Sequence, residues 1–145
     1  LYSRKILAHR TSNTMDVEFC LDALNDALLH YPSPDIFNTD QGSQFTSLKF
    51  TNKLLENDIK ISMDGKGRAI DNVYIERFFR TLKYENIFIE NYETPAKAKL
   101  GINNFIHFYN DERIHSSLDY KTPDEIYFNN LKGDDKPYNK RLLAA

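Results

Sequence analysis

Residues 36–47 read I-F-N-T-D-Q-G-S-Q-F-T-S, a short apolar run that passes directly into a polar turn. The first three residues predict a very short strand, and Gly42 marks the turn that ends it. Asp40 therefore stands at the carboxyl end of a predicted strand, where open α/β sheets generally place ligand-binding groups. Taken alone, an Asp in such a turn is more often a turn former whose side chain bonds nearby backbone.

Helical and strand patterns alternate on both sides of this run. Residues 47–57 predict a helix, Ile59–Ser62 predict a second strand, and Lys5–Arg10 are compatible with another strand. A helix capped by Asn13 or Thr14 is predicted before the run, because apolar residues recur there at helical spacing. They are Val17, Cys20, Leu21, Leu24, Leu28 and Tyr31. Helices that alternate with short strands predict an α/β layer architecture.

A further helix is predicted to begin at Asp71. Its buried stripe is expected to consist of Ile75, Phe78, Phe79 and Leu82, at i, i+3, i+4 and i+7. At about 100° per residue, Asn72, Glu76 and Lys83 share one flank of that stripe. The alternative is an ordinary amphipathic helix whose Glu76 and Arg80 form an exposed ion pair of small energy.

The sequence also predicts a helix that begins at Thr94-Pro95, with threonine as cap and proline in the first turn. Its buried residues are expected to be Ala98, Ile102, Phe105, Ile106 and Tyr109, and Phe108 is also expected in the core.

The composition is that of an ordinary globular domain. Of 145 residues, 41% are hydrophobic and 28% charged, which argues against a disordered or fibrous chain. No apolar stretch reaches the roughly 20 residues of a membrane-spanning helix, and we expect a cytoplasmic protein. The net charge of −2 gives no general argument for nucleic-acid binding. The single cysteine, Cys20, excludes a disulfide framework within the chain and a cysteine zinc cluster. We expect its side chain to pack in the core.

Carboxylates brought together from a strand end and a helix edge can hold divalent ions. Hard oxygen ligands suit Mg²⁺ or Mn²⁺. Two such ions about 3.5 to 4 Å apart can activate the attacking oxygen and stabilise the leaving oxygen of phosphodiester chemistry. Asp40 and Glu76 are the two candidates, and a third carboxylate is normally required. Lys83 would then offer a positive contact for a phosphate backbone.

Three blocks of sequence carry a resemblance to a known family: N-T-D-Q-G-S-Q-F-T-S at 38–47, D-N-V-Y-I-E-R-F-F-R-T-L-K-Y-E at 71–85 and Y-N-D-E-R-I-H-S-S-L-D-Y-K-T-P-D-E-I-Y at 109–127. They resemble insertion-sequence transposases that have a retroviral-integrase-like catalytic domain. Asp40 and Glu76 are separated by 35 residues, and Lys83 follows seven positions after Glu76. These intervals match the second and third acids of the family's Asp-Asp-Glu triad and its basic residue.

The resemblance implies a ribonuclease-H-like α/β fold with Asp40 and Glu76 as catalytic, metal-binding residues. It also implies two Mg²⁺ or Mn²⁺ ions and DNA cleavage with strand transfer, carried out by a multimer on DNA in the bacterial cytoplasm. Residues 1–130 would be the C-terminal part of the catalytic core, and residues 131–145 a frayed polar tail.

The family's first catalytic Asp and its first two strands would lie upstream of Leu1, so we expect an incomplete fold. The strand at Lys5–Arg10 is expected to lose its neighbour, and the chain alone is expected not to cleave DNA. One alternative is a decayed remnant that only binds nucleic acid or an intact transposase. A second alternative is a structure-specific nuclease of the same fold.

Several polar side chains are candidate DNA contacts on the same grounds. They are Lys83, Lys66, Arg80, Asn72, Gln41 and Gln44. For each basic residue a solvated surface role is the alternative, and for the two glutamines it is turn stabilisation. His115 could be a base or a ligand, but a lone histidine beside polar residues is more often structural.

Overall fold

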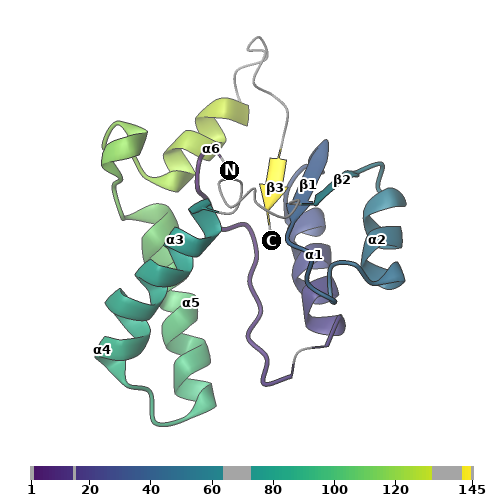
Figure 1. Cartoon of the computed structure of the whole chain (residues 1–145). Helices are drawn as coiled ribbons and strands as arrows, with labels where there is room; N and C mark the ends of the chain where they lie inside the picture. Colours follow the sequence, from purple (N-terminus) through teal and green to yellow (C-terminus); the bar gives the residue numbers. More distant parts are fainter. Residues whose placement is uncertain (1, 15, 64–72, 132–141, 145) are drawn as a thin grey trace. The chain divides into compact units, whose positions relative to one another are not determined.

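A computed structural model of the chain describes residues 2–14, 16–63, 73–131 and 142–144 (Figure 1). The chain forms two compact units. The helical unit comprises Leu1–Ile6 with Tyr74–Lys136, and the sheet unit comprises Leu7–Val73 with Pro137–Ala145. Each unit has its own hydrophobic core. Among the described residues, no helix combines the length and the apolar character that crossing a membrane requires.

The sheet unit contains a three-stranded parallel sheet in the order β2-β1-β3. The strands are β1 (Ile36–Thr39), β2 (Lys60–Met63) and β3 (Leu142–Ala144). The first two confirm the predicted strands. The third lies where a frayed tail was expected, so the structure differs from the prediction at these residues. A three-residue strand is defined by its pairing with β1, which the local sequence does not reveal.

Two helices accompany the sheet, α1 (Glu18–His30) and α2 (Leu48–Leu55), both as predicted. The Ser47 hydroxyl caps α2 by accepting a hydrogen bond from the Phe50 amide at 3.3 Å. The predicted cap of α1 is wrong. Asp16, rather than Asn13 or Thr14, accepts from the first turn, at 3.3 Å from the Phe19 amide. Asp16 lies two residues before the start of α1 and is therefore within hydrogen-bonding reach of the Phe19 amide.

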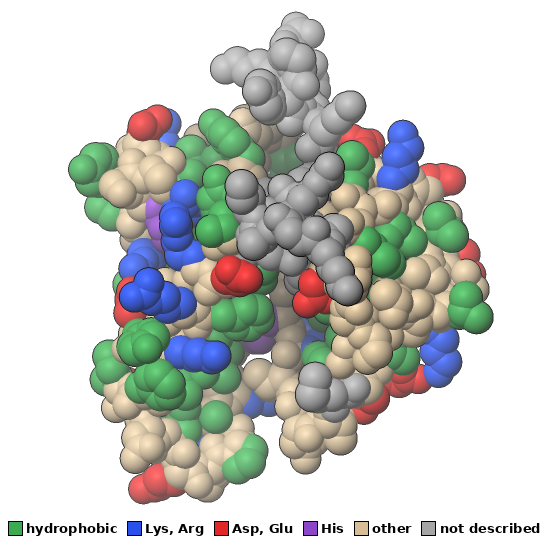
Figure 2. Space-filling view, in the orientation of Figure 1, with side chains coloured by type: hydrophobic (Ala, Val, Ile, Leu, Met, Phe, Trp, Pro, Cys, Tyr) green, Lys and Arg blue, Asp and Glu red, His purple; other side chains and the backbone are tan. Residues whose placement is uncertain are grey.

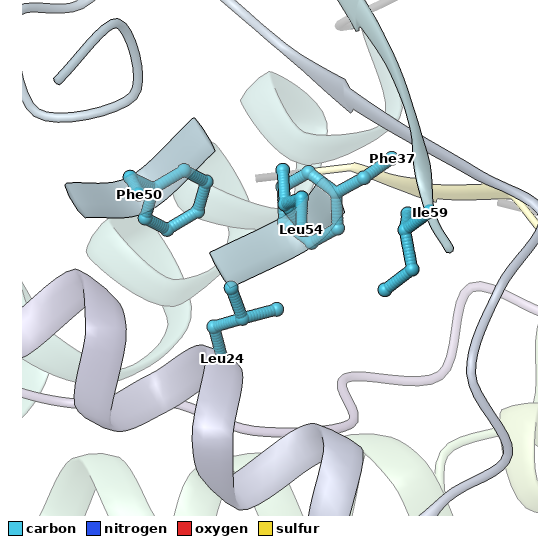
Figure 3. Packing of buried hydrophobic residues seen from close by; sticks show 5 residues of the cluster. All are labelled: Leu24, Phe37, Phe50, Leu54 and Ile59. Carbon is cyan, nitrogen blue, oxygen red and sulfur yellow. The ribbon is translucent and has the colours of Figure 1, made fainter. Parts of the chain in front are cut away.

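The core of the sheet unit is built by side chains from α1, β1, α2 and the residue before β2. Figure 3 shows them pointing toward one another: Leu24, Phe37, Phe50, Leu54 and Ile59. Cys20 is partly buried against this cluster, which confirms its predicted packing role.

The helical unit runs through α3 (Val73–Leu82), a π-helical turn η1 (Lys83–Ile87) and α4 (Phe88–Glu90). It continues through α5 (Pro95–Asp111), the 3₁₀ turn η2 (Ser116–Leu118) and α6 (Pro123–Leu131). The helices α3 and α5 lie side by side in Figure 1. Their core residues are Phe78, Leu82, Phe105, Ile106 and Tyr109.

Two aromatic residues expected in this core are in fact exposed. Phe79 is 50% exposed and Phe108 is 43% exposed. The core cluster on α3 follows the narrow line of Ile75, Phe78 and Leu82, and Phe79 lies at its edge, tilted against the Phe78 ring. Helical periodicity located the stripe correctly but overestimated its width.

The predicted strand at Lys5–Arg10 is wrong, because these residues form no strand in the structure. The side chain of Asn110 instead makes the two backbone hydrogen bonds of Ile6 that a neighbouring strand would make. The Ile6 amide donates to Asn110 Oδ1, and Asn110 Nδ2 donates to the Ile6 carbonyl, both at 2.9 Å. Lys5 pairs with Asp124 beside them. A strand needs a neighbouring backbone, and a side-chain amide satisfies only one residue.

Candidate active site and nucleic-acid interface

Asp40 follows directly after β1, whose last residue, Thr39, is fully buried. The Asp40 side chain is exposed, and its Oδ1 accepts a hydrogen bond from the Gly42 amide at 2.8 Å. Its role as a turn former is thereby confirmed. The second oxygen, Oδ2, has no hydrogen bond to the described residues and is available to a ligand.

Gly42 allows this close approach. A Cβ atom at this position would lie 2.9 Å from Asp40 Oδ1. A side chain here would therefore push the carboxylate out of its present position.

Glu76 lies exposed in the first turn of α3. Its carboxylate makes no hydrogen bond or ion pair with the described residues, so the ion pair to Arg80 is not observed. The Arg80 guanidinium lies instead 5.9 Å from the centre of the Tyr84 ring. The Glu76 carboxylate is therefore not neutralised by any cation of the described residues.

Glu76 and Lys83 line the same surface hollow, as the shared flank predicted. Lys83 is the first residue of η1, and its amine makes no ion pair with the described residues. Hydrophobic and basic side chains gather over α3 and α4 on the left of Figure 2. The hollow is lined by Glu76, Phe79, Arg80, Lys83, Tyr84 and Phe88.

The sequence analysis did not identify the three aromatic rings of this hollow as site residues, because it expected Phe79 in the core and singled out neither Tyr84 nor Phe88. Twelve residues of α-helix would place Phe88 about 120° away from Glu76. In the π-helical turn the Phe88 amide donates to the Lys83 carbonyl, five residues earlier, so the turn contains one residue more than an α-helical turn. The extra residue rotates Phe88 by about 100° around the helix axis, toward the side of Glu76. The i, i+4 spacing of Tyr84 and Phe88 is the only sequence signal for the pair.

The other candidate residues are distributed over the chain. Gln41 is exposed and Gln44 is half-buried, both in the turn after Asp40. Lys66 and Asn72 lie outside the described residues. Asp40 belongs to the sheet unit and Glu76 to the helical unit, so a metal site shared by their carboxylates stays a prediction. Within the described ranges, no three His, Cys, Asp or Glu residues are grouped as metal ligands.

His115 packs inside the helical unit, with its ring centre 4.9 Å from that of Tyr109. Burial, and secondarily the positive charges of Arg113 and Arg4, lower the pKa of His115 below its usual 6.5. Its Nε2 atom is buried without a hydrogen-bond partner in the described part of the chain. These contacts support a structural role. Nearby, a hydrogen bond from Arg113 lowers the pKa of Glu85 below its usual 4.5.

Acidification below about pH 6.5 is expected to destabilise the helical unit through His115. In the unfolded chain this imidazole takes up a proton near its ordinary pKa, whereas the folded unit resists protonation. The stability contributed by the neutral ring is therefore present above that pH and lost as the pH falls toward the folded pKa. Glu85 acts in a separate, lower window, because the stabilisation by its lowered pKa is lost only in more acidic solution.

Urea unfolding between about pH 7.5 and 5.5 measures this dependence. The variant His115→Phe keeps an aromatic ring against Tyr109 and is expected to reduce the dependence of the unfolding free energy on pH. His107→Gln, at an exposed histidine on α5, is the matched control and is expected to retain it. An unchanged slope in His115→Phe would contradict the assignment.

Comparison with known proteins identifies the family of the chain. Two family models, both described as "Integrase core domain", match residues 1–69 and 57–123. The chain is 38% identical over 129 residues to the transposase for insertion sequence element IS904 of Lactococcus lactis subsp. lactis (strain IL1403), which covers 87% of the chain and 51% of the relative. It is 31% identical over 134 residues to transposase InsF for insertion sequence IS3A of Escherichia coli (strain K12), covering 90% of the chain and 46% of the relative. The chain thus spans about half the length of these transposases.

Solved structures show the same fold. The catalytic core domain of BIV integrase matches with a TM-score of 0.70 at 18% identity, covering 89% of this chain and 81% of that one. The HTLV-2 integrase catalytic core domain in complex with magnesium matches with a TM-score of 0.63 at 19% identity, covering 83% and 74%. These likenesses confirm the predicted ribonuclease-H-like fold class. The chain therefore belongs to the integrase core domain family, and its sequence is similar to those of insertion-sequence transposases.

Proposed function

We propose that the chain acts in DNA transposition, as part of a metal-dependent enzyme that cleaves phosphodiester bonds and transfers DNA strands. The family and the similarity to transposases support this proposal. The observation that carries it is the state of the two motif acids. Asp40 and Glu76 are both exposed, and neither carboxylate is neutralised by an ion pair with the described residues.

Asp40 and Glu76 are proposed to hold Mg²⁺ or Mn²⁺, because carboxylate oxygens are the ligands that these ions prefer. The Gly42 amide would fix the Asp40 carboxylate by its bond to Oδ1, with Oδ2 left for the ion. When bound, such ions supply the positive charge that activates the attacking oxygen and stabilises the leaving oxygen.

DNA is the proposed partner, bound by a multimer of the complete protein. Lys83 is the leading candidate for a phosphate contact, because it lines the same hollow as Glu76 and its amine makes no ion pair with the described residues. The further candidates are Arg80, Lys66, Asn72, Gln41 and Gln44.

Calorimetric titration with MnCl₂ tests the proposed metal site. Asp40→Asn and Glu76→Gln are each expected to weaken Mn²⁺ binding about tenfold or more, since even outer-shell changes cost that much. Glu90→Gln, at an exposed acid on α4, is the control and is expected to bind as the unaltered chain does.

The double variant Asp40→Asn/Glu76→Gln distinguishes one shared site from two separate ones. Acids that hold the same ions interact, so the double variant is expected to lose less than the sum of the single losses. Fully additive losses would contradict a shared site. No Mn²⁺ binding by the unaltered chain would favour the alternative of a remnant that only binds nucleic acid or an intact transposase.

The 145-residue chain by itself is proposed not to cleave DNA, because two carboxylates do not fix both ions of a two-metal site. A strand-transfer assay with Mg²⁺ and duplex DNA is expected to show binding without joined or nicked products. Turnover by the purified chain would overturn this expectation.

A further inference from the structure

Three exposed aromatic side chains surround Glu76 and Lys83. Phe79 is 50% exposed, and Tyr84 and Phe88 are each 63% exposed. All three line the hollow of the helical unit. The exposed rings of one hollow offer aromatic surface to a ligand, because each keeps a large part of its area open to solvent. We call the rings of Tyr84 and Phe88 the aromatic corner.

The aromatic corner has a defined geometry. The ring centres of Tyr84 and Phe88 are 5.4 Å apart, and the ring planes meet at 88°. The π-helical turn brings the second ring onto the flank of Glu76, and such turns occur frequently at functional sites. A flat ligand placed against one ring therefore meets the second ring edge-on.

The charges of the hollow favour an anionic ligand. Arg80 and Lys83 are its two basic residues and Glu76 its single acid. Glu85, the next acid along the chain, is held by a two-point ion pair with Arg113. Rings for stacking beside cations for phosphates are the two components of surfaces that bind single-stranded nucleic acid.

A second copy of this chain fits the hollow less well. A symmetric dimer interface places the same patch on both subunits, so Arg80 and Lys83 would approach their own copies. Like charges brought together in an interface oppose association.

We propose that the hollow binds unpaired nucleotides at a DNA strand end, with a base stacked on the aromatic corner and the phosphates held by Arg80 and Lys83. The bases of an intact duplex are covered by their neighbours, so only an unpaired base offers its face to Tyr84 or Phe88. This inference rests on the proposed function, because it takes DNA as the substrate. It goes further by assigning the form of DNA and the side chains that distinguish it.

Fluorescence anisotropy with a labelled oligonucleotide of about 12 nucleotides tests the assignment, alongside the blunt duplex of the same sequence. The chain is expected to bind the single strand more tightly than the duplex. The double variant Tyr84→Ala/Phe88→Ala is expected to weaken single-strand binding about tenfold or more, and to leave duplex binding within about twofold.

Two further variants separate stacking from general apolar contact. Tyr84→Phe keeps the ring and is expected to bind the single strand as the unaltered chain does. Ile89→Ala removes an exposed apolar side chain, 69% accessible, from the same short helix but outside the hollow, and is expected to change neither affinity.

Equal weakening of single-strand and duplex binding by the double alanine variant would overturn the inference. So would unchanged oligonucleotide binding together with a change of oligomeric state in sedimentation, which would assign the corner to a second copy. The proposed function fails on a different result, the retention of Mn²⁺ affinity by Asp40→Asn and Glu76→Gln.

Discussion

Replacing Phe50 with alanine is expected to destabilise the sheet unit by about 3 to 5 kcal/mol. The Phe50 side chain is 1% exposed, and its ring packs edge-on against those of Phe37 and Phe45, at 5.7 and 5.3 Å between centres. The cost combines the lost burial of the ring with the cavity it leaves. Whole domains are stable by only about 5 to 15 kcal/mol, so this loss removes much of the stability available.

The consequence extends to the candidate site, because Phe37 precedes Asp40 and Phe45 follows it. Loss of the ring between them is expected to loosen the turn and to speed hydrogen exchange of the Gly42 amide. Urea unfolding and amide exchange measure the two effects. Leu48→Ala, at a residue 79% exposed in the same helix, is the control and is expected to change stability little. A loss below about 1 kcal/mol in Phe50→Ala would show that the ring is not a core element.

Local sequence signals predicted most of the regular elements. Apolar periodicity located α1 and α5, and Thr94 caps α5 as expected by accepting from the Lys97 amide at 3.2 Å. The strands β1 and β2 were recognised between turn residues. These features are decided by residues close together in the chain, which is the information that a single sequence carries.

The errors occur where distant residues decide the structure. Lys5–Arg10 has the composition of a strand, but Asn110, far along the chain, pairs with Ile6 instead. Strand β3 exists through its pairing with β1. Phe79 shares the spacing of buried residues, yet it lies at the edge of the α3 core line and stays half exposed.

The candidate site was predictable in part. The helical flank correctly placed Glu76 with Lys83, whereas Asp40, proposed from its position after a strand, stays a prediction as a site residue. The aromatic corner was not predictable, because the π-helical turn at Lys83–Ile87 breaks the 100° periodicity on which the flank was calculated.

Gly101 lies on α5 where the ring of Tyr92 crosses it, and Gly101→Ala is expected to destabilise the helical unit by about 3 kcal/mol. A Cβ atom there would overlap the phenol, with ring carbon Cε1 at only 2.6 Å. The displaced Tyr92 hydroxyl would lose its hydrogen bond to Asn86 Oδ1, now 2.9 Å long, and Asn86 is buried within η1. Helix propensity acts in the opposite direction, because alanine is favoured over glycine by about 1 kcal/mol. Overlap and the unsatisfied amide cost about 1 to 3 kcal/mol each, so destabilisation outweighs the gain.

Chemical denaturation of Gly101→Ala, Tyr92→Ala and the double variant decides between these opposing contributions. If overlap with the ring causes the loss, removing the ring abolishes it, and adding Gly101→Ala to Tyr92→Ala is expected to stabilise by about 1 kcal/mol. The effect of Gly101→Ala on stability is thus expected to be destabilising when the Tyr92 ring is present and stabilising when it is absent. A general effect on α5 would have the same sign in both backgrounds. Stabilisation by Gly101→Ala alone would show that Tyr92 does not lie on the helix. Because Asn86 belongs to the turn that carries Lys83, the destabilising single variant is also expected to weaken single-strand binding.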